Sequence, residues 1–156
     1  MGVQIGRQVE DRIFQEAENG CAICGLKDSR ALTIHHIEHE LAEVDNSYDN
    51  LILLCHNCHH MYHDGKGLSK ADIINLKRHL IHKTLTPFGI NALKIAYRKG
   101  AVAGVPFTLL HLVELGLLEE GEVISSIGSD DGLELNMDVV FSITDKGKEF
   151  YKKWIN

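Results

Sequence analysis

Residues 51–63 read Leu-Ile-Leu-Leu-Cys-His-Asn-Cys-His-His-Met-Tyr-His, an apolar run that leads into two cysteines and four histidines. The run at 51–54 predicts a short β-strand, and residues 57–63, followed by Asp64-Gly65, predict a helix that ends there. Seven of the ten histidines of the chain fall between residues 35 and 63. Such clustering predicts a functional site in this part of the chain.

The four cysteines form two pairs of equal spacing, Cys21-x-x-Cys24 and Cys55-x-x-Cys58, with thirty residues between Cys24 and Cys55. Zinc prefers four tetrahedral ligands, and a site closed by four thiolates is structural. Gly25 gives the first pair the permissive backbone that a tight metal turn needs. The spacing therefore predicts a structural Zn²⁺ that holds both ends of the histidine segment.

The histidines themselves are spaced for a second site. Residues 32–37 predict a strand, on which neighbours His35 and His36 point to opposite faces unless the strand bends or ends there. His59 and His63 lie four residues apart and share one face of the predicted helix, as two ligands of one metal should. His56, His60 and His63 also have helical spacing, so His60 is an alternative to His59.

These motifs together resemble the HNH endonuclease family in its zinc-knuckle variety. The resemblance is carried by His35-His36-Ile37, by Asp49-Asn50-Leu51-Ile52-Leu53-Leu54-Cys55 and by Cys58-His59-x-x-x-His63. It implies a ββα-metal module in which a β-hairpin and a helix grip one divalent ion, either Mg²⁺, Mn²⁺, Ni²⁺ or Zn²⁺. By the same resemblance His36 is the general base, and Asn50 fixes the hairpin loop and the orientation of that base. The implied ligands of the catalytic ion are His35, His59 and His63. His59 is preferred to His60 because the first helical histidine of the family directly follows the last cysteine.

The remainder of the chain predicts a second domain. Helices are expected at 70–83, with Ser69 as N-cap, at 88–99 after Thr86-Pro87, and at 106–115. A hairpin is expected from 122–127 and 133–143, and Thr144 is expected to cap a last helix at 145–154. This order resembles the end of a winged-helix domain, which often closes on a Thr-x-x-Gly helix. The predicted fold class is α+β, with the HNH module and zinc knot in 1–68 and a helical, winged-helix-like domain in 69–156.

Charge gives the expected partners. The net charge is −6, yet residues 66–83 are basic, and four side chains there are predicted phosphate contacts: Lys66, Lys70, Lys77 and Arg78. The residues from Thr84 onward include seven Lys or Arg and ten Asp or Glu. The helix predicted at 106–115 offers few polar or basic side chains that could contact base edges. A structural role or the binding of a protein partner is therefore expected for the C-terminal half.

The sequence predicts a metal-dependent endonuclease that hydrolyses DNA phosphodiester bonds, with RNA not excluded. The alternative is a non-catalytic zinc-ribbon and winged-helix module that binds nucleic acid or protein. Residues 1–20 are polar and do not resemble a signal peptide, and no apolar run is long enough to span a bilayer. A cytoplasmic protein without membrane contact is therefore expected. In such a reducing compartment, paired cysteines favour metal binding over disulfides.

Overall fold

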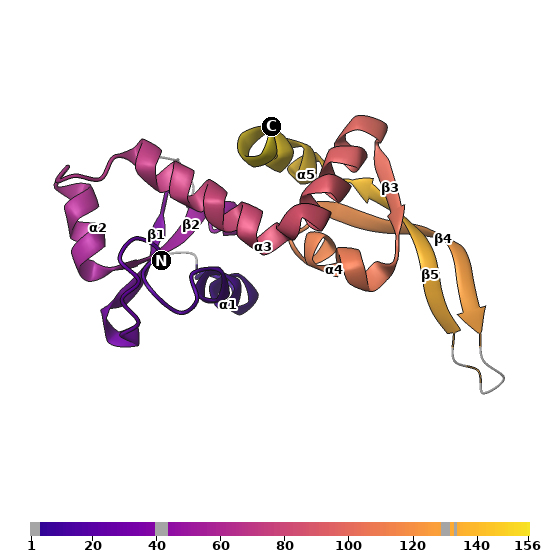
Figure 1. Ribbon diagram of the computed structural model, residues 1–156, viewed down its shortest axis with the longest axis horizontal. Coiled ribbons are helices and arrows are strands. Elements are labelled where there is room, and N and C mark those ends of the chain that lie inside the picture. Colours follow the sequence, from indigo (N-terminus) through magenta and orange to yellow (C-terminus); the bar gives the residue numbers. More distant parts are fainter. Residues whose placement is uncertain (1–3, 40–43, 129–131, 133) are drawn as a thin grey trace. The chain divides into compact units, whose positions relative to one another are not determined.

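The computed structural model describes residues 4–39, 44–128, 132 and 134–156, and the chain forms two compact units, Met1–Thr84 and Leu85–Asn156. The elements of each unit are seen in Figure 1. Helix and strand are mixed in both units, as the predicted α+β class requires. Within the described residues, no helix combines the length and the hydropathy that crossing a membrane requires.

The first unit is built around a two-stranded hairpin. Strands β1 (Leu32–His36) and β2 (Leu51–Cys55) pair antiparallel, with His35 opposite Ile52 and His36 opposite Leu51. All five residues of β2 are buried, which explains why this strand is apolar throughout instead of alternating. The other elements of this unit are α1 (Arg7–Glu16), the 3₁₀ turns η1 (Ser29–Ala31) and η2 (Tyr48–Asn50), α2 (His56–His63) and the first part of α3 (Lys70–Lys99).

Helix α3 begins and breaks where the sequence predicts. The Ser69 hydroxyl accepts a hydrogen bond from the Asp72 N–H, and the Asp72 carboxylate accepts one from the Ser69 N–H at 2.9 Å, so the two residues cap the helix reciprocally. Thr86 leaves the helical conformation, with φ 60° and ψ 162°. Thr86 precedes Pro87, whose ring disfavours the helical conformation for the residue before it.

The division between the units differs from the boundary expected after residue 68. It falls inside α3, because the part of this helix before Leu85 packs on the first unit through buried residues such as Ile73 and Ile81. Residues 70–83, expected as the first helix of the second domain, therefore belong to the unit that carries the cysteines and the clustered histidines.

A buried polar network joins α1, η2 and α3. The Lys77 ammonium donates to one carboxylate oxygen of Glu16 at 2.5 Å, and the Tyr48 hydroxyl donates to the other at 2.6 Å. The Lys77 nitrogen also lies 3.9 Å from the centre of the Tyr48 ring, a cation–π contact. Burial raises the pKa of Glu16 and lowers that of Lys77, and their mutual attraction opposes both shifts.

This network corrects one prediction. Lys77 was expected to contact phosphate, but its side chain is 0% exposed and is bound to Glu16. A lysine in that position cannot reach a nucleic-acid backbone. The sequence pattern could not distinguish it from the exposed lysines of the same basic stretch, because its partner lies 61 residues away along the chain.

We expect Lys77→Ala to destabilise the first unit by about 3–5 kcal/mol, because it leaves the Glu16 carboxylate buried without its partner. Urea unfolding followed by circular dichroism measures the loss. The double variant Glu16→Gln/Lys77→Met removes both charges and should cost clearly less. Equal losses for the single and the double variant would contradict the assignment. Lys83→Ala is the matched control, since Lys83 pairs with Glu18 at the surface and its loss should change stability little.

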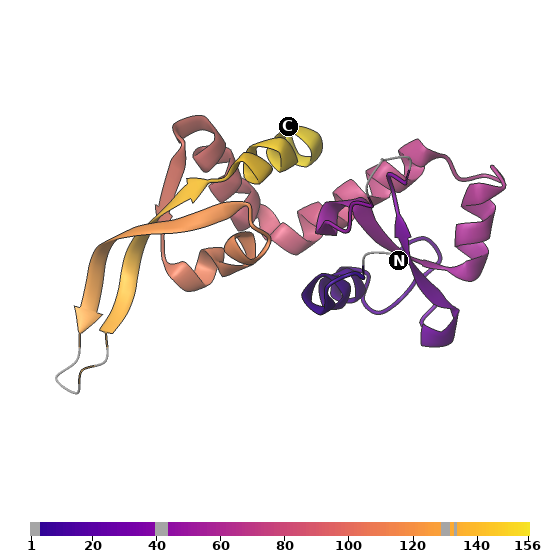
Figure 2. The same ribbon diagram turned by 180° about the vertical axis from the view of Figure 1, so that it is seen from behind.

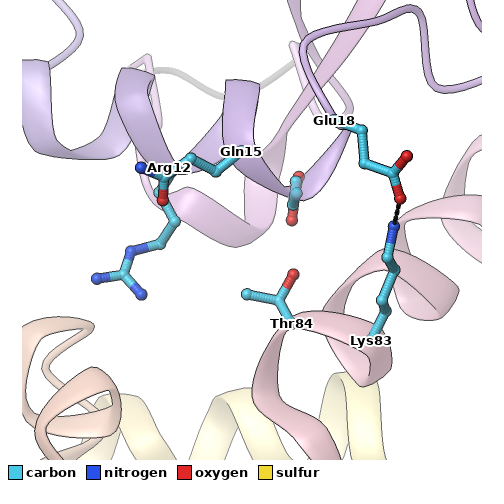
Figure 3. A pocket seen from close by; sticks show the side chains of 6 residues that line it. Arg12, Gln15, Glu18, Lys83 and Thr84 are labelled. Atoms are coloured by element: carbon cyan, nitrogen blue, oxygen red, sulfur yellow. Dashed lines mark hydrogen bonds and ion pairs between the residues drawn. The ribbon is translucent and has the colours of Figure 1, made fainter.

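A pocket lies between α1 and the end of the first part of α3 (Figure 3). Arg12, Gln15 and Glu16 line it from α1, and Lys83 and Thr84 line it from α3. The exposed Lys83 donates to Glu18 at its edge, as the dashed line in Figure 3 marks. The pocket and the buried network show that α1 and the first part of α3 pack together around the hairpin.

The second unit contains a three-stranded antiparallel sheet in the order β3-β5-β4. Its elements are the part of α3 from residue 85 on, β3 (Ala101–Gly104), α4 (Pro106–Glu114), β4 (Leu118–Gly128), β5 (Glu134–Ile143), α5 (Asp145–Phe150) and a π-helical turn (Tyr151–Ile155). Strands β4 and β5 continue beyond β3 as a twisted ribbon, seen from both sides in Figures 1 and 2. Phe141 of β5 and Trp154 are among the residues fully buried in this unit.

The helices, the hairpin and the Thr144 cap of this unit agree with the sequence prediction, whereas β3 was not predicted. The Thr144 hydroxyl accepts from the Gly147 N–H at 2.9 Å. A Cβ at Gly147 would lie 2.1 Å from the Leu117 carbonyl oxygen, so only glycine fits there. Strand β4 also begins at Leu118, earlier than expected. The resemblance of this half to a winged-helix domain stays a prediction.

Candidate metal centres and active site

The hairpin and α2 bring the cysteines and histidines together, because α2 begins directly after β2 ends. Two groups of side chains result. The first consists of Cys21, Cys24, Cys55 and Cys58, and the second of His35, His59 and His63. In each group the potential ligand atoms all lie within 4.8 Å of one another. Both groups consist of residues that the sequence predicts as metal ligands.

The four-cysteine group fits a structural zinc ion. The Cys24 and Cys55 sulfurs are 3.7 Å apart, and sulfurs bound to tetrahedral zinc at about 2.3 Å lie about 3.8 Å from one another. No disulfide links the four thiols. Three of the cysteines are buried and Cys24 is exposed. The donor set and its spacing therefore suit zinc without rearrangement.

Local backbone geometry forms both cysteine turns. Cys55 is the N-cap of α2, and its sulfur accepts a hydrogen bond from the Cys58 N–H at 3.4 Å. In the other turn Gly25 has φ 74°, a conformation that favours glycine, and its N–H donates to the Cys21 carbonyl. Burial acts to raise the pKa of Cys21, but hydrogen bonds from surrounding backbone groups outweigh it and lower the pKa to about 7. A thiol of this kind readily becomes the thiolate that binds metal.

The three-histidine group has the spacing of a metal site. The Nε2 atoms of His59 and His63 are 3.3 Å apart, and imidazole nitrogens bound to a tetrahedral ion at about 2.1 Å lie about 3.4 Å from one another. The His35 ring centre is 4.9 Å from that of His59 and 5.3 Å from that of His63. One strand residue and two helix residues thus converge on one point.

The surroundings of His35 suit a metal ligand. Its side chain is buried, and within the described residues its Nε2 atom has no hydrogen-bond partner. Burial, with the neighbouring histidines His59 and His63 as further causes, lowers the pKa of His35 to about 4. The ring is therefore neutral at cellular pH. A buried nitrogen without a hydrogen-bond partner beside two other imidazoles is what a metal ion would satisfy.

The geometry distinguishes His59 from His60. His59 points into the three-histidine group, whereas the exposed His60 pairs through Nε2 with the Asp64 carboxylate at 3.2 Å. His56, at the start of α2, is exposed as well. Of the two alternatives that the spacing left open, His59 therefore shares the site and His60 faces solvent.

His36 does not belong to the three-histidine group. Its Nε2 lies 2.7 Å from the Asn46 side-chain oxygen. An amide oxygen only accepts hydrogen bonds, so this contact requires the proton on Nε2. The neutral ring then carries its lone pair on Nδ1, where it can accept a proton from water.

Asn50 fixes the loop that joins the two strands. Its side-chain oxygen accepts from the Glu38 N–H at 2.8 Å, and its amide nitrogen donates to the carbonyls of Glu38 at 3.1 Å and Asp45 at 2.9 Å. The residue is completely buried. Its hydrogen bonds hold backbone groups on both sides of the loop, and the His36 ring itself is contacted by Asn46.

The other predicted phosphate contacts lie at the surface of the first unit. Lys66 pairs with Asp64 at 3.1 Å, Lys70 pairs with Glu38 at 2.5 Å, and the exposed Arg78 donates to the Asn75 side chain at 3.3 Å. Unlike Lys77, these three side chains are exposed to solvent.

The sequence predicted no role in the site for three residues near it. Asn46 contacts His36 from the loop, the Tyr62 ring centre lies 5.0 Å from that of His35, and the His39 ring approaches both His35 and His63. Tyr62 follows His59 by three residues, so helical spacing could have indicated it. Nothing in the sequence indicated Asn46, because its approach depends on the path of the loop.

Comparison with known protein families agrees with this geometry. Residues 21–65 match the HNH endonuclease family model, and the match contains all four cysteines and the three clustered histidines. This segment is an HNH endonuclease domain. HNH domains are of nuclease type. The HNH domain covers less than a third of the chain, and residues 66–156 lie outside the match.

Part of the chain is similar to part of a curated protein, the Zorya protein ZorE of Escherichia coli. The two chains are 28% identical over 79 residues, which are 49% of this chain and 22% of the relative. The matched segment thus spans less than a quarter of that protein. No solved structure matches the chain.

Proposed function

We propose that this protein is a metal-dependent endonuclease that hydrolyses DNA phosphodiester bonds at the HNH domain. The observation that carries the proposal is the convergence of His35, His59 and His63, with the buried His35 nitrogen left without a partner within the described residues. A structural site would be expected to be closed, as the four-cysteine group is. Three imidazoles instead leave a tetrahedral ion one position for a substrate or water.

In this proposal the chain's own residues hold the reacting groups. His35, His59 and His63 would hold one divalent ion, which would supply Lewis-acid chemistry at a phosphate oxygen. His36 accepts the proton of the attacking water at Nδ1, while Asn46 keeps the other proton of the ring on Nε2. The water oxygen bonds to phosphorus as the bond to the 3′-oxygen breaks, and the departing 3′-oxygen takes a proton from solvent. The products are then a 5′-phosphate and a 3′-hydroxyl end.

Asn50 and the cysteines support these groups without taking part in the reaction. Asn50 anchors both sides of the loop that follows His36, so the base is held on a fixed backbone. The four cysteines bind zinc and thereby hold the first turn of α2, which carries His59, against the turn at Cys21. Lys66, Lys70 and Arg78 are proposed to contact the phosphates of the nucleic acid.

The test is cleavage of supercoiled plasmid by the pure protein with and without Mg²⁺, Mn²⁺, Ni²⁺ or Zn²⁺. We expect nicked and linear products only when a divalent ion is present, and no products from the His59→Ala/His63→Ala variant. His60→Ala is the matched control, because this histidine lies on the same helix but faces solvent, and it should cut like the wild type. A metal-loaded wild type that cuts neither DNA nor RNA would contradict the proposal.

A further inference from the structure

The backbone next to His39 is held firmly beside the three-histidine group. Asn50 forms hydrogen bonds with both the N–H and the carbonyl of Glu38, the residue before His39. The Glu38 side chain is also fixed, since its carboxylate accepts from Lys70 at 2.5 Å. These contacts of Glu38 fix the backbone next to His39, although His39 lies beyond the end of β1.

The His39 ring lies beside the clustered imidazoles and not among them. Its centre is 5.9 Å from that of His63 and 6.1 Å from that of His35, whereas the rings within the group are 4.5 to 5.3 Å apart. The nitrogens that lie within 4.8 Å of one another belong to His35, His59 and His63 alone among the described residues. His39 is thus adjacent to the three-histidine group without being one of its members.

His39 is also exposed to solvent, as is His63, and a substrate can approach the three-histidine group from this exposed side. The group runs from His35, which is buried, through the half-buried His59 to His63, which is exposed, and His39 is exposed as well. Within the part of the chain that the structure describes, no hydrogen bond or ion pair occupies the His39 ring nitrogens. An exposed donor without a partner, next to the open side of the group, is suited to an anionic oxygen.

We propose that His39 contacts the scissile phosphate, donating a hydrogen bond from its ring to a non-bridging oxygen. This inference rests on the proposed function, because it assumes that the phosphate is bound at the three-histidine group. The contact positions the phosphodiester beside His36 and the metal ligands. It adds a substrate-binding residue that lies outside the ligand set and apart from the proposed base.

Isothermal titration of zinc-loaded protein with Ni²⁺, followed by titration of the nickel-loaded protein with inorganic phosphate, tests the proposal. For His39→Ala we expect the Ni²⁺ affinity to stay within about twofold of the wild type and the phosphate affinity to fall about tenfold, the loss of one hydrogen bond to a charged group. The KM for bis(4-nitrophenyl) phosphate should rise by a similar factor. His39→Gln, which keeps an N–H donor, should recover part of the loss, and His60→Ala should change neither affinity.

Two results would overturn the inference. A His39→Ala variant that loses Ni²⁺ affinity together with phosphate affinity would make His39 a metal ligand, and one that keeps both affinities and the wild-type KM would leave it without a role. Failure of the nuclease proposal looks different, because the wild type itself would then hydrolyse neither plasmid nor the small phosphodiester.

Discussion

His36→Ala is expected to lower the rate of DNA cleavage by about 10²–10⁴-fold while the protein stays folded and binds both metals, because a positioned general base contributes that much. The side chain is not part of the three-histidine group, so its removal leaves the metal ligands in place. Plasmid nicking under single-turnover conditions measures the rate. The metal content of the purified variant is measured in parallel.

A second substitution, Asn46→Ala, tests whether Asn46 holds the His36 ring in place. Without the amide oxygen at 2.7 Å, the His36 ring is free to rotate and to carry its proton on either nitrogen. We expect a smaller loss of rate than for His36→Ala, and no further loss when the two substitutions are combined, since they act through one group. A His36→Ala variant that cuts as fast as the wild type would remove the histidine from the mechanism.

Removal of zinc is expected to unfold the first unit. Structural zinc contributes about 10–16 kcal/mol of apparent folding free energy in small zinc-binding domains at pH 7, more than the core of a unit of this size can replace. Here the ion would join the turn at Cys21 to the start of α2, which are far apart in sequence. A strong chelator, or the substitution Cys58→Ser, should therefore abolish much of the helical circular-dichroism signal and all cleavage.

The second unit supplies an internal control for the chelation experiment. The single tryptophan of the chain, Trp154, is buried in that unit, and all four cysteines lie in the first unit. Its fluorescence should therefore stay that of a buried indole while the first unit unfolds. Chelation that releases zinc but leaves the circular-dichroism spectrum unchanged would contradict a structural role for the four-cysteine group.

Much of the site could be read from the sequence, because its residues are fixed by local geometry. Two Cys-x-x-Cys pairs and a histidine pair four residues apart on a helix specify which side chains share a face. The structure brings the cysteines together as one group and the three predicted histidine ligands as another. It also gives β1, β2 and α2 nearly the predicted bounds.

Other features depended on contacts between distant parts of the chain. Lys77 belongs to the same basic stretch as Lys70 and Arg78, and only its packing against Glu16 and Tyr48 makes it a buried residue. Strand β3 is a short segment rich in small residues, and its pairing with β5 makes it a strand. The contact of Asn46 with His36 and the approach of His39 to His63 are not specified by any local pattern.

The sequence by itself determined the identity of the two groups of metal-binding side chains, since ligand type and spacing along a strand or a helix are local properties. The tertiary structure decided which remaining side chains surround them and which cationic residues reach the surface. The physical reason is that burial and hydrogen bonding between distant segments depend on the path of the whole chain, which no local pattern encodes.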